Sequence, residues 1–316
     1  MISISHSRVQ CYLSCPYSHY LRYIEKITKK GRNRPLSFGS DFHKLLEVRK
    51  DKKRVKHEFS KIKENYYDLD SESQSNLGDN YLQDLKEIFV DYMKIYKDTV
   101  FPYETEVQFE IPTRTKFNNK QIIFKGVIDE IYDTEDGILI GEHKTYNRKP
   151  DLITITMNTQ KCLYAKAIEF MTGKLPVSII WDYVKSSPAQ RPVWLEKSGR
   201  FSESKSNNIT EFSWIRACKE KGIKDPKILS KGKDLYEGNI HNFFFRYNED
   251  YIKEMVDDIY NGFEYMSIEI AKNGDINKTK HTGNGCSWCE YRDICYAELT
   301  GGNVEYVKSK DYEERQ

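Results

Sequence analysis

Apolar residues recur at helical spacing in several segments of the chain. Between residues 80 and 97 they fall three or four positions apart, which predicts an amphipathic helix. Residues 3–27 predict two short helices that are broken at Pro16, and Ser5 is the expected cap of the first. Ser40 is the expected cap of a third helix. The remaining helices are predicted over residues 40–50, 157–171 and 251–271.

In the middle of the chain the period changes from helical spacing to strict alternation. Polar and apolar residues alternate from Glu104 to Ile111, which predicts a half-buried strand. Residues 134–137, with the sequence Thr-Glu-Asp-Gly, predict a tight turn between two further strands. The strands are predicted over residues 104–111, 121–132, 138–145 and 177–184. This order of helices and strands predicts an α/β fold, with a mixed central sheet flanked by helices.

We expect a single domain over residues 1–316, built from four consecutive parts. A polar stretch rich in Pro, Gly, Ser and Lys predicts an insertion or a flexible region in the second half of the chain. The parts are residues 1–100, which are helical; 101–185, which hold the strands; 186–245, the insertion; and 246–316, a long helix followed by cysteines.

Composition and charge narrow the class of protein. The mean hydropathy is −0.74 and no apolar run is long enough to cross a bilayer, so we expect no membrane partner. The first residues lack the layout of a secretory signal, which favours a cytoplasmic location. Because the net charge is only +2, nucleic acid would have to bind local basic patches. Residues 26–34 and 49–57 are the candidates, and an ordinary solvated surface is the alternative for each.

The predicted hairpin brings charged side chains together. Counting outward from the centre of the turn, between Glu135 and Asp136, places Asp129 opposite Glu142 on the neighbouring strand. Such a pair has Cβ atoms roughly 4.5–5.5 Å apart, so the two negative charges favour a divalent cation between them. Lys144 lies two residues after Glu142 and points to the same face. The alternative is an exposed strand with ordinary alternating charges.

Two further positions are ambiguous from the sequence. Gln160 and Tyr164 are four residues apart on a predicted helix, so they share a face that could approach the same site. Packing and surface roles are the alternatives for both. His43 lies on the helix predicted over 40–50, where a lone histidine is most often structural.

Seven cysteines are present, and three of them lie within ten residues near the C-terminus. The spacing Cys286-x2-Cys289-x5-Cys295 is typical of metal ligands, whereas an odd number of cysteines argues against a disulfide framework. A fourth ligand would come from elsewhere, with Cys15 and Cys11 as the leading candidates and His281 after them. This spacing does not distinguish zinc from an iron–sulfur cluster, and simple packing of the cysteines is the alternative.

With these motifs in order, the chain resembles the RecB-type branch of the PD-(D/E)XK nuclease superfamily. It is most similar to members that carry a four-cysteine iron–sulfur cluster, including stand-alone phage and CRISPR-adaptation nucleases. The resemblance runs from residue 5 to about residue 297. It rests on Cys15-Pro16-Tyr17, Gly39-Ser40-Asp41-Phe42-His43, Glu106, Gly126-Val127-Ile128-Asp129, Glu142-His143-Lys144-Thr145, Gln160-x3-Tyr164, and Cys286, Cys289 and Cys295.

The resemblance implies a restriction-endonuclease-like fold and a metal site. Asp129 and Glu142 are expected to bind Mg²⁺ or Mn²⁺ together with the backbone carbonyl of His143. His43 is expected as a further ligand, and Glu106 as an outer or additional one. The resemblance also implies a [4Fe–4S] cluster that joins the chain ends, held by Cys15, Cys286, Cys289 and Cys295.

The same resemblance implies an activity. Lys144 is expected to position or activate the attacking water, while Gln160 and Tyr164 orient Lys144 or the DNA backbone. The expected function is a metal-dependent DNA exonuclease, acting on single strands or free ends in phage or bacterial replication, recombination or end processing. Replication or recombination proteins are the expected partners. The alternative is a non-catalytic DNA-binding scaffold that retains the fold. The phosphate-binding motif G-x4-G-K-[ST] of helicases is absent, so we expect a stand-alone protein.

Overall fold

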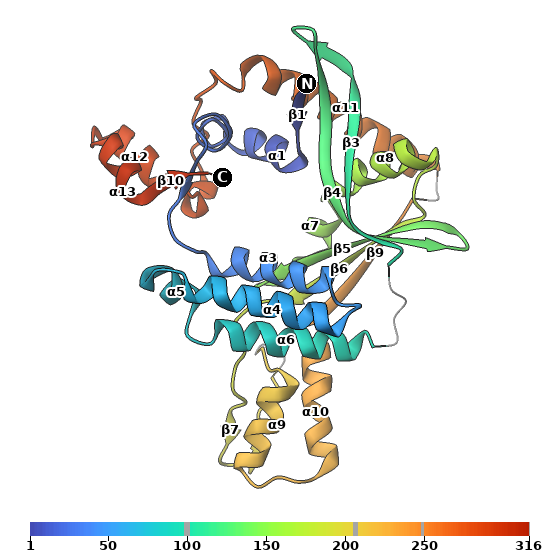
Figure 1. Ribbon diagram of the computed structural model, residues 1–316, viewed down its shortest axis with the longest axis vertical. Helices are drawn as coiled ribbons and strands as arrows, with labels where there is room; N and C mark the ends of the chain where they lie inside the picture. Colours follow the sequence, from blue (N-terminus) through green and yellow to red (C-terminus); the bar gives the residue numbers. More distant parts are fainter. Residues whose placement is uncertain (98–101, 205–207, 248–249, 316) are drawn as a thin grey trace.

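A six-stranded mixed sheet forms the centre of the computed structural model, which describes residues 1–97, 102–204, 208–247 and 250–315 (Figure 1). The strand order is β1–β4–β5–β6–β9, and β3 pairs with the remaining edge of β4. The pairs β1–β4 and β5–β6 are parallel and the others are antiparallel. The predicted mixed central sheet is confirmed. Its strands are Ile2–Ile4 (β1), Glu104–Phe117 (β3), Lys120–Thr134 (β4), Gly137–Tyr146 (β5), Ser178–Lys185 (β6) and Ile240–Arg246 (β9).

Helices cover both faces of this sheet (Figure 1). On one face, α1, α8 and α11 share the main hydrophobic core with strand residues such as Phe124 and Trp181. On the other face, α3, α4 and α6 enclose a second core around Phe42 and Leu85, which reaches the sheet at Val184. The helices are His6–Ser14 (α1), Arg34–Glu47 (α3), Lys52–Tyr67 (α4), Ser71–Leu77 (α5), Tyr81–Ile95 (α6), Leu152–Thr156 (α7), Gln160–Thr172 (α8) and Asp250–Asn273 (α11).

The helix α3 begins earlier than the sequence pattern predicts. Asn33 caps it by accepting a hydrogen bond from the backbone N–H of Leu36, and Pro35 lies in its first turn. Both residues favour a helix start, so Ser40 lies inside the helix and the prediction that Ser40 is the cap is wrong. The cap predicted at Ser5 is confirmed, because its hydroxyl accepts from the N–H of Arg8.

The segment predicted as an insertion folds into a small unit below the sheet (Figure 1). Trp214 and Phe201 lie in its own hydrophobic core. The last residues of the predicted range, 240–245, belong instead to β9 of the central sheet. The boundary predicted between residues 100 and 101 lies outside the described residues. The unit contains Trp194–Leu195 (β7), Arg200–Phe201 (β8), Glu211–Glu220 (α9) and Pro226–Glu237 (α10).

The two ends of the chain pack against each other in a separate lobe (Figure 1). We call residues 15–30 and 279–315 the cysteine lobe. Its strands β2 and β10 are antiparallel, and Leu21 and Ile294 lie in its core. The elements are Pro16–His19 (α2), the π-helix Tyr20–Ile24 (η1), Ile27–Lys29 (β2), the 3₁₀ helix Asn284–Trp288 (η2), Arg292–Thr300 (α12), Val304–Asp311 (α13) and Tyr312–Glu314 (β10).

Candidate metal centre

The pairing of β3 with β4 brings two carboxylates to the same level of the sheet. Thr105 pairs with Glu130 in antiparallel register, which places the next residue, Glu106, opposite Asp129. Glu106 adopts a φ of 52°, a left-handed conformation that is uncommon for residues other than glycine. Such local strain often accompanies functional sites.

The pairing of β4 with β5 adds a third carboxylate at this level. Glu130 pairs with Gly141, which places Glu142 opposite Asp129, as the turn predicted. Asp129 therefore lies on the central one of three strands, with Glu106 on one side and Glu142 on the other. The N–H of His143 donates a hydrogen bond of 2.8 Å to Asp129 Oδ2 and fixes that carboxylate.

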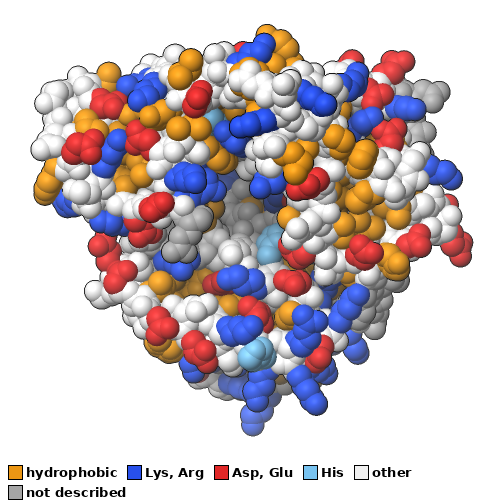
Figure 2. All heavy atoms as spheres, turned by 45° about the horizontal axis from the view of Figure 1, so that its top comes forward, with side chains coloured by type: hydrophobic (Ala, Val, Ile, Leu, Met, Phe, Trp, Pro, Cys, Tyr) orange, Lys and Arg blue, Asp and Glu red, His pale blue; other side chains and the backbone are white. Residues whose placement is uncertain are grey.

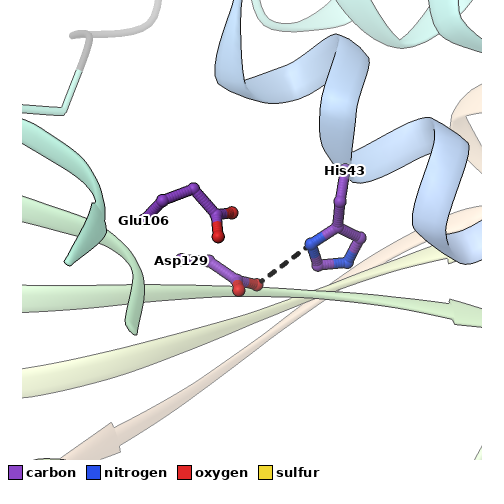
Figure 3. A group of neighbouring side chains, drawn as sticks. All are labelled: His43, Glu106 and Asp129. Atoms are coloured by element: carbon purple, nitrogen blue, oxygen red, sulfur yellow. Dashed lines mark ion pairs between the residues drawn. The ribbon is translucent and has the colours of Figure 1, made fainter. Parts of the chain in front are cut away.

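A histidine approaches the carboxylates from the helix layer. Nδ1 of His43, on α3, lies 3.6 Å from Oδ2 of Asp129. Ligand atoms of His43, Glu106 and Asp129 all lie within 4.8 Å of one another, and the three side chains point into a common space (Figure 3). One nitrogen and two carboxylate groups from three different elements thus converge, which is a donor set that fits a divalent cation.

Glu142 lies outside this group of three and is almost completely buried. Its Oε1 accepts hydrogen bonds from Lys144 and, at 3.2 Å, from the amide of Gln160. Its other oxygen, Oε2, is buried without a hydrogen-bond partner. A buried carboxylate oxygen that lacks a donor is costly, and a cation would satisfy it.

Tyr164 closes the site from the side of α8. On one edge of β4, β1 pairs with residues 122–124 and β5 with residues 130–134, which leaves the backbone between them open. The carbonyl of Val127, within this opening, accepts a hydrogen bond of 2.7 Å from the Tyr164 hydroxyl. Gln160 also donates to that hydroxyl. The structure therefore brings together the predicted pair on α8 and the predicted carboxylates.

The ionisation of these groups reflects their crowding. Burial raises the pKa of Asp129 and of Glu142. Burial and the charge of Asp129 raise the pKa of Glu106 to about 7. Burial and the nearby His143 lower the pKa of His43 to about 4, so its imidazole is neutral and has a free lone pair at neutral pH. Carboxylates that resist ionisation together with a neutral imidazole favour a bound cation.

Lys144 remains charged beside these groups. Burial alone would lower the pKa of Lys144, but the charges of Glu142 and Asp129 outweigh this effect and raise it. The site therefore offers a fixed ammonium group next to its carboxylates. The role predicted for the backbone carbonyl of His143 stays a prediction.

The side chain of His143 reveals a buried network that the sequence did not predict. Its Nδ1 lies 3.1 Å from Asp182 Oδ2, and its Nε2 lies 3.0 Å from Glu130 Oε1. The contact with Glu130 is an ion pair whose angle does not suit a hydrogen bond. Burial opposes protonation of His143, but these two carboxylates raise its pKa to about 10. One signal of this network is present in the sequence: Asp182 places a carboxylate inside the apolar run 178–184.

The cysteines predicted to hold a cluster line one cavity beside the cysteine lobe, and they are Cys15, Cys286, Cys289 and Cys295. All are free thiols. Burial and the charges of the neighbouring Cys15 and Cys286 raise the pKa of Cys289. Cys11 lines the same cavity, but its sulfur lies 3.7 Å from the Ser18 hydroxyl. Within the described part of the chain, these sulfurs do not form a group close enough to share one ion.

A mixed sheet that carries carboxylates, a lysine and a histidine at one level defines an α/β protein with a candidate metal-binding site. The chain belongs to the PD-(D/E)XK nuclease superfamily, because the model of that family matches residues 3–296. The superfamily comprises nucleases that use divalent metal ions, which agrees with the donor set described above.

Comparison with solved structures gives only distant likenesses. The crystal structure of SSO0001 is 13% identical over 82% of this chain and 86% of that chain, with a TM-score of 0.33. Rai1 from Scheffersomyces stipitis, in complex with (3'-NADP)+ and calcium ion, is 10% identical over 96% of this chain and 70% of that chain, with a TM-score of 0.20. No curated protein matches the chain. Among the described helices, none has the length and apolar character needed to span a bilayer.

Proposed function

We propose that this protein is a metal-dependent DNA exonuclease that hydrolyses phosphodiester bonds. The observation that carries the proposal is the position of Asp129, between Glu106 and Glu142 on adjacent strands and facing His43. These four side chains would hold Mg²⁺ or Mn²⁺. When bound, such an ion would supply charge stabilisation to the phosphate and lower the pKa of an attacking water.

The remaining side chains of the site position the reacting groups. Lys144, kept as an ammonium by Glu142, neutralises charge on the phosphate and orients the water by donating a hydrogen bond. Gln160 holds the Oε1 of Glu142, while Tyr164 ties α8 to the backbone of β4. The geometry at Glu142 is therefore fixed before substrate binds.

We propose DNA single strands or DNA with free ends as the substrate. The ordered motifs resemble stand-alone phage and CRISPR-adaptation nucleases, which supports a role in replication, recombination or end processing in a bacterial cytoplasm or a phage-infected host. Replication or recombination proteins are the partners that such a role requires. End-labelled linear DNA and a closed circle of the same sequence would separate exonuclease from endonuclease cleavage.

We propose that the four cysteines hold a [4Fe–4S] cluster. All four are free thiols that line one cavity, so they are available to a single centre. Four thiols on two distant segments of the chain are the donor chemistry that such a cluster needs. Iron and sulfide analysis together with the visible absorption spectrum would test this assignment.

Replacing Asp129 tests the activity directly. Asp129→Asn keeps the shape of the side chain but removes a charge that the divalent ion requires, so cleavage with Mn²⁺ should fall by at least about 100-fold while DNA binding persists. The matched control is Asp133→Asn, an exposed position four residues later on β4, which should cleave as the wild type does. Equal cleavage by the Asp129→Asn variant and its control would refute the proposal, and binding without cleavage by the wild type would favour the scaffold alternative.

A further inference from the structure

A cavity of about 1690 Å³ lies between the cysteine lobe and the first turn of α3. Seven lysine and arginine side chains line it, against a single carboxylate, Glu290. This imbalance contrasts with the nearly neutral chain. Four of the cations belong to residues 26–34, the first basic patch found in the sequence. Figure 2 shows a hollow in the middle of one face, with Lys or Arg side chains and Asp or Glu side chains around it.

Part of this positive charge is compensated by ion pairs within the lobe. Lys29, for example, contacts Asp293 at 2.7 Å, and Lys280 contacts Glu298 at 2.8 Å. Arg32 is exposed and, among the described residues, forms no ion pair. The cavity therefore offers an anionic ligand the cation of Arg32, unpaired within the described part of the chain. It also offers cations that are held in position by ion pairs within the lobe.

The wall of the cavity also presents aromatic side chains to solvent. Trp288, between two of the cysteines, is 92% exposed, although a tryptophan buries more apolar surface than almost any other side chain when it packs. On α12, Arg292, Tyr296 and Leu299 lie at spacings of four and three, so they share the face that lines the cavity. Exposed rings interleaved with cations are typical of surfaces that bind single-stranded nucleic acid.

One end of the cavity lies near the candidate metal centre. His6 and Gln10 line it there, and both contact the Thr159 hydroxyl, at 3.1 and 3.4 Å. The next residue, Gln160, donates to the buried Glu142. Side-chain contacts therefore link this end of the cavity to the carboxylates through Thr159 and Gln160.

We propose that this cavity holds unpaired nucleotides of the DNA strand being cleaved, with a base stacked on Trp288 and phosphates along the cations that include Arg32. The substrate in this inference rests on the proposed function. A single strand is required because base faces are covered in a duplex and only an unpaired base can stack on a side chain. Trp288 then fixes how far the held base lies from the scissile phosphate.

Binding without cleavage tests the inference. A fluorescein-labelled oligothymidine of about 12 nucleotides, titrated in EDTA and followed by anisotropy, matches the site sizes of stacking grooves. Trp288→Leu should weaken binding on the order of tenfold, whereas Trp288→Phe, which keeps an aromatic face, should stay close to the wild type. The control is Tyr265→Leu, another exposed aromatic, on α11, that does not line the cavity.

The cation is tested away from the cysteines, so that loss of folding in the lobe cannot mimic the result. Arg32→Gln should weaken binding and lower the slope of log K against log salt by about 0.7, whereas Arg200→Gln, exposed on β8, should change neither. The inference is overturned if the Trp288→Leu variant binds the oligothymidine as tightly as the Tyr265→Leu control does. It is also overturned if the Trp288→Leu variant loses as much affinity for blunt duplex DNA as for the single strand. If the wild type cleaves DNA but every variant binds DNA as the wild type does, the proposed nuclease stands and the proposed role of the cavity is wrong. If the variants lose binding but the wild type never cleaves DNA, the proposed role of the cavity stands and the proposed nuclease is wrong.

Discussion

At the scale of single residues, a buried positive charge supports the candidate site from behind. The imidazolium of His143 lies between Glu130 and Asp182, while the N–H of the same residue donates to Asp129. Arg49 adds a second cation to Glu130. Burial raises the pKa of Glu130, but the contacts with His143 and Arg49 outweigh this effect and lower the pKa to about 2. The side chain of His143 thus anchors the backbone that holds Asp129.

Removing the carboxylate of Glu130 should destabilise the protein in a pH-dependent way. The pKa of Glu130 is below its ordinary value of 4.5, so its contribution is complete above pH 4.5 and is lost as the pH falls toward 2. The pKa of His143 is above its ordinary value of 6.5, so its contribution is complete below pH 6.5 and is lost as the pH rises toward 10. Glu130→Gln should therefore cost about 3–5 kcal/mol of unfolding free energy. The effect should be largest between pH 4.5 and pH 6.5, where both contributions are complete.

Urea unfolding of this variant and the wild type at several pH values measures the effect. Glu110→Gln, on the exposed face of β3, is the matched control and should cost less than about 0.5 kcal/mol at every pH. A difference between Glu130→Gln and wild type that stays constant from pH 3 to pH 10 would show that the charges of the network do not contribute.

The sequence predicts the residues that face the metal site better than those that support it. The register of Asp129 and Glu142 follows from turn length, because side chains alternate with a period of two along a strand. The contacts of His143 depend on Asp182, which comes from a strand joined by a long crossover through α8. No local pattern fixes that pairing, so the network behind the site appears only in the fold.

At the scale of elements, β4 is the strand on which the site depends. It pairs with β3 along one edge and with both β1 and β5 along the other, and it carries Asp129 where those two partners separate. Gly126, three residues before Asp129, is packed closely under a neighbouring ring. A Cβ atom there would lie 2.6 Å from Cζ of Phe109, much closer than van der Waals contact. Only glycine lets this ring lie against the strand.

Gly126→Ala should therefore destabilise the fold and disturb the site together. We expect a cost of about 1–3 kcal/mol in unfolding free energy from overpacking, and a loss of cleavage because the strand that carries Asp129 shifts. Gly262→Ala is the control, because its Cβ atom meets open space on the helix α11. This control should leave stability unchanged or raise it by up to about 1 kcal/mol. Wild-type stability in the Gly126→Ala variant would contradict the close packing of Phe109.

The predictions for elements are strongest where apolar residues repeat over long segments. The helix predicted over residues 80–97 and the strands of the hairpin agree with α6, β4 and β5, because one buried face imposes a regular pattern. The stretch 186–245 has a polar composition, yet part of it packs around Trp214. A small core needs few apolar residues, so its signal is lost among the exposed lysines and serines that surround it.

At the scale of the whole molecule, a strand pair and a hydrophobic core hold the two chain ends together. The pairing of β2 with β10 and the core around Leu21 and Ile294 already join the N-terminal and C-terminal segments. Nearly the whole chain lies between them, so each added link removes much conformational freedom from the unfolded state. A metal cluster on these segments would strengthen an existing contact between the chain ends.

Loss of one proposed cluster ligand measures how much the link contributes. Cys286→Ser should remove the brown colour expected of the proposed iron–sulfur cluster. It should also lower the Tm, because a group bound only by the folded protein adds its binding free energy to stability. Each kcal/mol lost corresponds to a fall of roughly 2–4 °C in Tm in chains of this order of size.

The control is Cys11→Ser, because the Cys11 sulfur contacts Ser18; this variant should keep both colour and Tm. Because the β2–β10 pair and the core around Leu21 also join the chain ends, the Cys286→Ser variant should still fold and bind DNA. An unchanged Tm after loss of iron would assign the cluster a role other than stabilising the fold, whereas a colour change in the Cys11→Ser variant would make Cys11 the ligand.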